Sequence, residues 1–144
     1  MSGIQKVGII GAGQMGSGIA HVCALSGMDV VLQDLSMDKV EEGLATISGN
    51  MTRQASKDII KEAEIKPALA RIQASDSYEN MADCDLVIES ATEDETIKRK
   101  ILSQLAPVVK SDSILATNTS SISITRLAAS TDRPEKFIGI HFMN

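Results

Sequence analysis

The feature that most constrains this chain is a glycine-rich segment, residues 11–16 (GAGQMG), which lies between an apolar run and a helical pattern. The spacing G-x-G-x-x-G is a weak indicator by itself, because glycines also mark ordinary turns. Here residues 4–10 are typical of a buried parallel strand that opens directly into the glycines. Residues 14–27 then repeat apolar side chains at helical spacing, which predicts a helix that ends near Gly27. This order favours a phosphate-binding turn over an ordinary one.

Each glycine of this segment has its own predicted task. Gly11 makes the tight turn, Gly13 lets the backbone approach a pyrophosphate, and Gly16 lets the helix pack closely on the sheet. The free backbone N–H groups at the helix start, at Gln14 and Met15, would face the phosphates together with the positive end of the helix dipole. We therefore predict that these five residues contact the diphosphate of a dinucleotide.

An acidic residue indicates which dinucleotide is bound. Asp34 stands 23 residues after Gly11, at the end of a second strand-like run, residues 29–33. At this distance from the glycines, a carboxylate accepts hydrogen bonds from the hydroxyls of the adenosine ribose, and its charge repels a 2′-phosphate. No arginine follows within residues 35–37. NAD is therefore favoured over NADP; without the glycines, a loop-starting or capping role for Asp34 would be the better interpretation.

Strand-like and helix-like segments alternate along the whole chain. This alternation predicts βαβ units, and hence one α/β domain of Rossmann type, residues 1–144, with a doubly wound, mostly parallel sheet. Gly43, Gly49 and Asn50 are expected to interrupt the helical segment 37–66, and Ser36 is expected to cap its start. The expected strands are residues 4–10, 29–33, 69–74, 86–89, 113–116 and 137–141, and the other expected helices are residues 14–27, 94–109 and 122–129.

Composition excludes several classes of function. A net charge of −5 over 144 residues argues against a nucleic-acid binder, which would normally be basic. No apolar run approaches the roughly 20 residues of a membrane helix, and the start lacks the pattern of a signal peptide. Cys23 and Cys84 are expected to be reduced thiols of a cytoplasmic protein, each a small buried hydrophobe. No Cys/His spacing resembles a metal site, so none is predicted.

Polar residues follow the later strands, where a ligand of a Rossmann domain lies. Residues 117–121 come after the fifth strand, and His141 ends the sixth. A histidine side chain has an ordinary pKa of about 6.5, which suits a base that takes the proton of an alcohol. His141 is therefore a candidate base and Ser120 a candidate hydrogen-bond donor to the substrate oxygen. The alternatives are a structural histidine for His141 and a helix cap for Ser120.

For three other polar residues, the sequence pattern alone favours a structural role over a catalytic or binding role. Glu93 and Lys98 flank the start of the helix expected at 94–109, and spacing alone favours a solvated, charged helix beginning. His21 lies on the first helix near Val22 and is expected to pack rather than to react.

Four segments together resemble the 3-hydroxyacyl-CoA dehydrogenase family, of which bacterial 3-hydroxybutyryl-CoA dehydrogenases are the most similar members. The resemblance covers the whole chain and is weakest at 37–80. Asn-Thr-Ser-Ser at 118–121 and Gly-Ile-His-Phe at 139–142 are far more specific than the glycine turn. The segments are residues 11–20 (GAGQMGSGIA), 85–89 (DLVIE), 118–125 (NTSSISIT) and 138–142 (IGIHF), the last followed by Asn144.

The resemblance implies reversible oxidation of an L-3-hydroxyacyl-CoA of short chain to the 3-oxoacyl-CoA with NAD. It puts His141 at the position of the catalytic base and Ser120 at that of the substrate-oxygen ligand. An acyl-CoA is then the implied substrate, and residues 37–60 would meet the CoA moiety. The full-length proteins of the family are expected to be homo-oligomers through a helical C-terminal domain, which lies beyond the position of Asn144.

Four further residues gain a role from the same resemblance. Glu93 and Lys98 match a family pair near the cofactor, and Asn118 and Asn144 match asparagines on the nicotinamide side. One departure is conservative, because Met143 stands where the family usually has Phe.

A second departure concerns activity. The family's orienting Glu for the catalytic His lies beyond the position of Asn144. We therefore expect the 144 residues alone to bind NAD but to turn over poorly. The alternatives are an NAD-binding module without turnover and a relative that oxidises another hydroxy acid; the segments at 118–125 and 138–142 disfavour the second.

Overall fold

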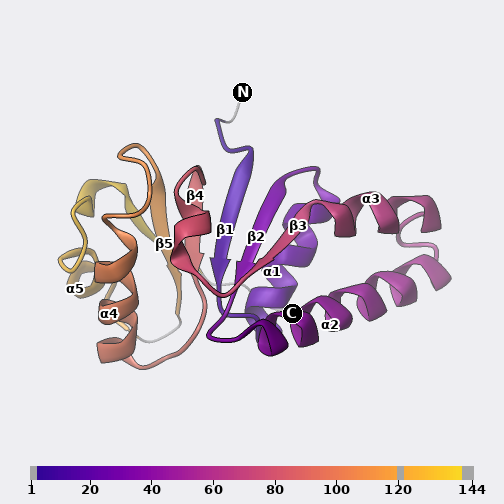
Figure 1. Ribbon diagram of the computed structural model, residues 1–144, viewed down its shortest axis with the longest axis horizontal. Coiled ribbons are helices and arrows are strands. Elements are labelled where there is room, and N and C mark those ends of the chain that lie inside the picture. Colours follow the sequence, from indigo (N-terminus) through magenta and orange to yellow (C-terminus); the bar gives the residue numbers. More distant parts are fainter. Residues whose placement is uncertain (1–2, 120–121, 141–144) are drawn as a thin grey trace.

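The computed structural model describes residues 3–119 and 122–140 and contains one six-stranded parallel sheet (Figure 1). The strand order is β3-β2-β1-β4-β5-β6. The second and third strands are added on one side of β1 and the last three on its other side, so the order reverses between the neighbours β1 and β4. A ligand of such a sheet lies at this reversal, outside the carboxyl ends of the strands. The predicted Rossmann-type fold is confirmed. The strands are β1 (Lys6–Ile10), β2 (Asp29–Gln33), β3 (Ile72–Ser75), β4 (Leu86–Glu89), β5 (Ile114–Asn118) and β6 (Phe137–Ile140).

Helices cover both faces of the sheet, α1–α3 over β1–β3 and α4 and α5 near β4 and β5 (Figure 1). Successive strand residues alternate between two apolar cores, as in Ile9 and Ile10 of β1. One core packs against α1, α2 and α3, and the other against α4 and α5. The helices are α1 (Gln14–Leu25), α2 (Met37–Ser56), α3 (Ile65–Ala70), α4 (Glu95–Leu105) and α5 (Ile124–Ala128), with short 3-10 turns η1 (Glu62–Glu64), η2 (Tyr78–Met81) and η3 (Pro134–Lys136).

Helix α2 is continuous, so the predicted interruptions at Gly43, Gly49 and Asn50 are wrong. Gly43 has a packing role instead. A Cβ atom there would lie 2.8 Å from the Ala12 carbonyl oxygen and 2.8 Å from the Ser17 hydroxyl. The missing side chain therefore lets α2 approach the glycine turn and α1. The predicted cap is confirmed, because the Ser36 hydroxyl accepts the Lys39 N–H at 3.3 Å.

The third strand is Ile72–Ser75 rather than residues 69–74, because Leu69 and Ala70 still belong to α3. Pro67 does not end this helix. It lies in the first turn of α3, where its missing N–H has no intrahelical partner to lose. Helix α1 ends as expected before Gly27, whose φ of 93° is the left-handed conformation that glycine adopts easily.

Helix α4 is shorter than predicted and ends at Leu105 instead of Val109. The buried guanidinium of Arg133 binds carbonyl groups just beyond this end. It donates to Ala106 O at 3.1 Å, Lys110 O at 2.5 Å and Ser113 O at 3.2 Å. One side chain thus satisfies three backbone acceptors between α4 and β5.

Candidate functional site

The glycine turn joins β1 to α1 in a backbone arrangement that two of its glycines require. Gly11 has a φ of 106°, and a Cβ atom on it would lie 2.7 Å from the Ser90 carbonyl oxygen. A Cβ atom on Gly16 would lie 1.7 Å from the Gly11 carbonyl oxygen. Gly13 differs, because a Cβ atom there meets nothing within 4 Å. The space in front of Gly13 is therefore free for a ligand to approach the backbone at the start of α1.

Asp34 follows β2 and faces this turn. Its Oδ2 accepts the Ala12 N–H at 2.8 Å, and its Oδ1 accepts the Leu35 N–H at 2.7 Å. These bonds fix the carboxylate beside the turn, and a carboxylate has further lone pairs for ribose hydroxyls. Asp34 lines a pocket of about 590 Å³, here called the Asp34 pocket, together with Gly11 and Gly13.

The far wall of the Asp34 pocket is largely apolar and suits a flat ring. Tyr78 of η2 and Ile97 and Ile101 of α4 line this part of the pocket. Burial, and then the negative charges of Glu89 and Asp34, raise the pKa of the Tyr78 hydroxyl above its ordinary value. Tyr78 therefore stays a neutral hydroxyl at physiological pH.

A second pocket, of about 290 Å³, lies on the other side of the turn and is here called the Asn118 pocket. Gly13 and residues 90–92 line both pockets, so the two adjoin each other at the start of α1. The Asn118 side chain donates to the Ser90 hydroxyl at 3.3 Å. Five residues predicted from the sequence meet in this pocket: Gly13, Gln14, Met15, Glu93 and Asn118.

Lys98 lies in a buried network, so the solvated helix start that spacing alone favoured is wrong, while the role near the cofactor that the resemblance implies stays a prediction. Its side chain and that of Glu89 are both fully buried, and they form an ion pair. The Lys98 ammonium also donates to Asn118 O at 3.1 Å, and the Thr117 hydroxyl donates to Glu89 Oε1 at 2.7 Å. Glu93 is exposed and accepts the Thr119 hydroxyl at 3.1 Å.

Sequence reasoning placed Glu89 at a strand end but did not assign it a role. The available indication was an acid that ends a buried strand, followed nine residues later by a lysine on the next helix. That lysine lies on the helix face that packs on the sheet, with Ile101, Leu102 and Leu105. A cation on a buried face requires an acidic partner, and Glu89 is that partner.

The predicted catalytic residues His141 and Ser120, with Asn144, lie outside the described residues. The described ends of the strands that precede them are adjacent, because Thr119 N–H donates to Ile140 O at 3.3 Å. The packing role predicted for His21 is confirmed: the side chain is 7% exposed, and Nε2 lies 2.7 Å from Gln54 Oε1.

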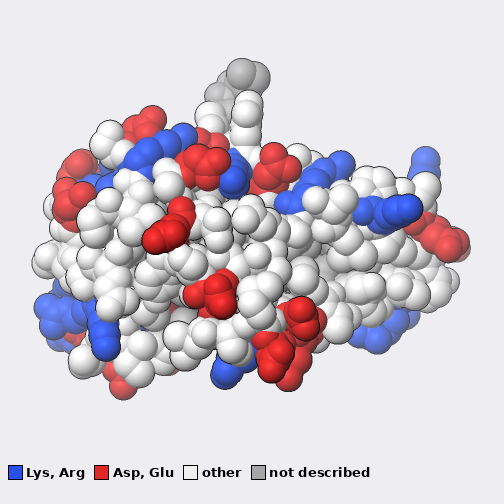
Figure 2. Space-filling view, viewed as in Figure 1, with Lys and Arg blue, Asp and Glu red and all other residues white. Residues whose placement is uncertain are grey.

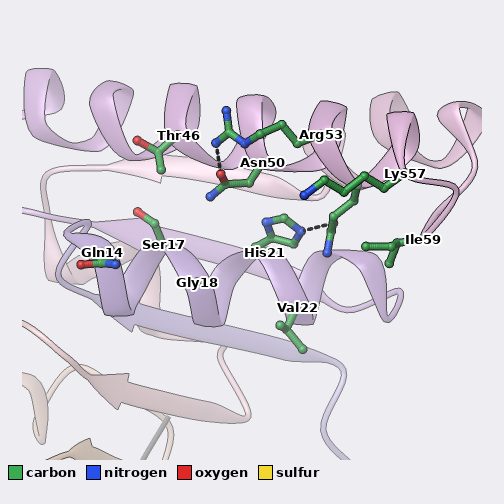
Figure 3. A pocket seen from close by; sticks show the side chains of 11 residues that line it. Gln14, Ser17, Gly18, His21, Val22, Thr46, Asn50, Arg53, Lys57 and Ile59 are labelled. Atoms are coloured by element: carbon green, nitrogen blue, oxygen red, sulfur yellow. Dashed lines mark hydrogen bonds between the residues drawn. The ribbon is translucent and has the colours of Figure 1, made fainter. Parts of the chain in front are cut away.

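A third pocket, of about 470 Å³, runs between α1 and α2 and is here called the helix groove (Figure 3). Arg53 of α2 and Lys57, which directly follows this helix, line it together with His21 of α1. Gln14, at the first turn of α1, lines both the helix groove and the Asn118 pocket. The two pockets therefore adjoin each other at this side chain.

Charged side chains of both signs are interspersed over the face shown in Figure 2, over both helical layers. Among the described residues, no helix is long and apolar enough to cross a membrane. Within the same residues, no group of three or more His, Cys, Asp or Glu side chains is placed to hold a metal ion. Both cysteines are free thiols; Cys84 is buried and Cys23 half-buried.

Comparison with known proteins identifies the family. A family model described as 3-hydroxyacyl-CoA dehydrogenase, NAD binding domain, matches residues 6–144. This chain belongs to the 3-hydroxyacyl-CoA dehydrogenase family. The resemblance stated from the sequence motifs is thereby confirmed, and NAD is the cofactor that the matched domain of this dehydrogenase family binds.

Individual relatives of this dehydrogenase family agree. The chain is 61% identical over 141 residues to a 3-hydroxybutyryl-CoA dehydrogenase of Bradyrhizobium diazoefficiens. The aligned region spans 98% of this chain and 48% of that relative. The chain is 37% identical to the fatty acid oxidation complex subunit alpha of Acinetobacter baumannii, of which it covers 20%. The crystal structure of (S)-3-hydroxybutyryl-CoA dehydrogenase from Ralstonia eutropha superposes with a TM-score of 0.95 at 49% identity, covering 98% of this chain and 50% of that one. The chain thus spans about half the length of the 3-hydroxybutyryl-CoA dehydrogenases it matches.

Proposed function

We propose that this chain is the NAD-binding part of an enzyme that oxidises short-chain L-3-hydroxyacyl-CoA, such as 3-hydroxybutyryl-CoA, to the 3-oxoacyl-CoA. The observation that carries the proposal is the pair of adjacent pockets that share the glycine turn as a wall. The Asp34 pocket has a carboxylate at one end for the adenosine ribose. The Asn118 pocket begins where the diphosphate would end. Membership of the dehydrogenase family supports this assignment.

The residues present fit a dinucleotide. The open space before Gly13 admits a diphosphate to the N-terminus of α1, where backbone N–H groups and the helix dipole favour an anion. The apolar wall with Tyr78 suits the adenine, and the Asn118 pocket is then left for the nicotinamide. Within this assignment Gly11, Gly16, Gln14 and Met15 form the diphosphate turn.

NAD, when bound, supplies the acceptor for the hydride that leaves the hydroxyl-bearing carbon of the substrate. In the proposal, His141 takes the proton of the same hydroxyl, and the O–H bond electrons form the new carbonyl. Ser120 donates a hydrogen bond to that oxygen and holds it near the base. Glu93, Asn118 and Asn144 are assigned to the nicotinamide side.

The CoA moiety is proposed to lie in the helix groove. Arg53 and Lys57 place two cations along a groove that adjoins the Asn118 pocket at Gln14. The phosphates of CoA would meet these cations, and the acyl end would pass Gln14 toward the nicotinamide. The exposed apolar side chains of Val22 and Ile59 line the same groove and suit the pantetheine arm.

The decisive experiment concerns Asp34. Asp34→Asn removes the negative charge but keeps one amide oxygen for the backbone N–H groups. We expect NAD affinity to fall about tenfold to a hundredfold, because the ribose hydroxyls lose bonds to a charged acceptor. The preference for NAD over NADP should narrow at the same time, since less charge opposes a 2′-phosphate. Calorimetric titration with each dinucleotide measures both effects.

Asp38→Asn is the matched control, because Asp38 is an exposed acid on the first turn of α2 and does not line the Asp34 pocket. Its NAD affinity should equal that of the parent. An absence of heat with NAD for the parent, or equal affinities for the parent and Asp34→Asn, would contradict the proposed cofactor site.

The helix groove gives a separate prediction. Lys57→Glu should raise the Kd for acetoacetyl-CoA about tenfold or more, because an attraction to phosphate becomes a repulsion. The Kd for NAD should not change, since Lys57 lines neither of the pockets assigned to the dinucleotide. Lys66→Glu, on the exposed side of α3, is the control of equal charge change. If both variants bound acetoacetyl-CoA with the same Kd, the proposal that CoA lies in the helix groove would be contradicted.

The wider setting of the domain belongs to the same proposal. Residues 1–144 are taken as one NAD-binding domain, active within a longer protein and nearly inactive alone, in the reduced environment of the cytoplasm. Assembly into homo-oligomers through a region beyond Asn144 stays a prediction from the family resemblance. An NAD-binding module without turnover of its own remains the second candidate, and a coupled assay with acetoacetyl-CoA and NADH separates the two.

A further inference from the structure

The Asp34 pocket is lined in part by a buried amide group, that of Gln33 at the end of β2. Gln33 is 3% exposed and lines the pocket together with Ile10 and Tyr78. Its Nε2 donates to the backbone carbonyl of Asp34 at 3.0 Å. This bond fixes the orientation of the amide, because a carbonyl oxygen accepts hydrogen bonds and donates none.

The other end of the same amide is the Gln33 Oε1 atom. Within residues 3–119 and 122–140, no group donates a hydrogen bond to this shielded oxygen. Buried acceptors are nearly always paired, so each exception requires an explanation. A donor on a ligand that enters the pocket is the explanation that the location of Gln33 favours.

A small pocket of about 210 Å³, here called the Asp76 pocket, adjoins the Asp34 pocket on this side. Gln33, Leu35, Tyr78 and Gln104 line both pockets. Asp76, which directly follows β3, is the charged residue in the lining of the small pocket. A carboxylate and the Gln33 oxygen are both acceptors, so this end of the combined space favours a ligand group that donates hydrogen bonds.

The adenine of NAD carries a group of this kind. In the proposed assignment its ribose lies at Asp34 and its ring lies against the apolar wall of the Asp34 pocket. The 6-amino group of adenine donates hydrogen bonds, whereas a 6-oxo purine presents an acceptor at the same position. A protein acceptor at this place would therefore be left facing another acceptor when the wrong base is bound, which is a strong source of selectivity.

We propose that Gln33 is a specificity-determining residue for the base of the dinucleotide, and that its Oε1 accepts a hydrogen bond from the 6-amino group of adenine. A small rotation about the last side-chain bond of Gln33, which is a soft torsion, brings the shielded oxygen to the ligand. The inference rests on the proposed NAD function. Stability alone does not account for this residue, because an apolar side chain at the same buried position would leave no acceptor unpaired.

The test uses Gln33→Met, which keeps the length of the side chain and removes its acceptor. NAD is titrated beside nicotinamide hypoxanthine dinucleotide, which has an oxygen in place of the 6-amino group. The parent should bind NAD about tenfold or more tightly than the hypoxanthine analogue, and this preference should fall below about threefold in the variant. The change should come from weaker binding of NAD, while the Tm without ligand stays close to that of the parent.

Gln73→Met is the matched control, because it makes the same substitution on the neighbouring strand β3. Gln73 is exposed and lines neither the Asp34 pocket nor the Asp76 pocket. This variant should keep the preference of the parent for NAD over the hypoxanthine analogue.

The remaining outcomes also decide the question. Equal affinity of the parent for the two dinucleotides would overturn the inference, and so would an unchanged preference in Gln33→Met. Loss of both dinucleotides by the same factor, or failure of Gln33→Met to fold, would overturn it as well, because Gln33 would then shape the domain without selecting the base. If the parent bound neither dinucleotide, the proposed function itself would be overturned.

Discussion

Gly13→Ala is expected to weaken NAD binding about a hundredfold while the free energy of unfolding falls by no more than about 1 kcal/mol, since Gly13 is the N-cap of α1. Gly13 has φ −72° and ψ −167°, a conformation that alanine adopts freely. The added methyl group meets no protein atom within 4 Å. It would instead occupy the space through which the diphosphate approaches the start of α1. This variant should therefore lose NAD affinity while its stability stays close to that of the parent.

Calorimetry with NAD and thermal melting without ligand measure the two quantities. Gly16→Ala is the informative comparison, because its methyl group would lie 1.7 Å from the Gly11 carbonyl oxygen. That variant should lose stability and NAD binding together. If Gly13→Ala bound NAD as tightly as the parent, the diphosphate would not lie on this turn.

Arg133→Met is expected to lower the free energy of unfolding by about 3 kcal/mol and the Tm by roughly 10 °C. The Arg133 side chain is almost fully buried, and its guanidinium satisfies the carbonyls of Ala106, Lys110 and Ser113. Methionine fills part of the space but donates no hydrogen bond, so these buried acceptors lose their donor. Chemical denaturation followed by circular dichroism measures the loss.

Arg126→Met supplies the comparison for Arg133. Arg126 also bonds an acid, Glu95, but its side chain is 65% exposed. Exposed ion pairs contribute about 0–1 kcal/mol, so this variant should melt close to the parent. Similar losses in the two variants would show that the carbonyl contacts of Arg133 contribute little.

Local patterns predicted the parts of the fold whose causes are local. Residues 29–33 form a strand with the predicted bounds, and Asp34 lies beside the glycine turn as expected, because chain order fixes both. Helix α2 was predicted with interruptions because glycine is a poor helix former. The close approach of α2 to Ala12, which Gly43 permits, is a tertiary contact that no local pattern contains.

The residues of the candidate site also fall into those that local spacing predicts and those that depend on tertiary contacts. The residues of the glycine turn could be named from their spacing and context alone. The burial of Lys98 could not be predicted, because it depends on Glu89 and Thr117, which the strands β4 and β5 bring to it. The third strand was expected to begin at residue 69, but Leu69 and Ala70 belong to the short helix α3, whose first turn contains Pro67.

One residue, Gln14, forms a wall common to the helix groove and the Asn118 pocket. A ligand in the helix groove and a ligand in the Asn118 pocket would both contact this side chain, so their binding free energies are expected to be coupled. If a ligand in the helix groove changes the affinity for the dinucleotide by some factor, the dinucleotide changes the affinity for that ligand by the same factor, because the free energies around the binding cycle sum to zero. Cooperativity between dinucleotide and thioester, of either sign, would thus begin at a single amide on the first turn of a helix.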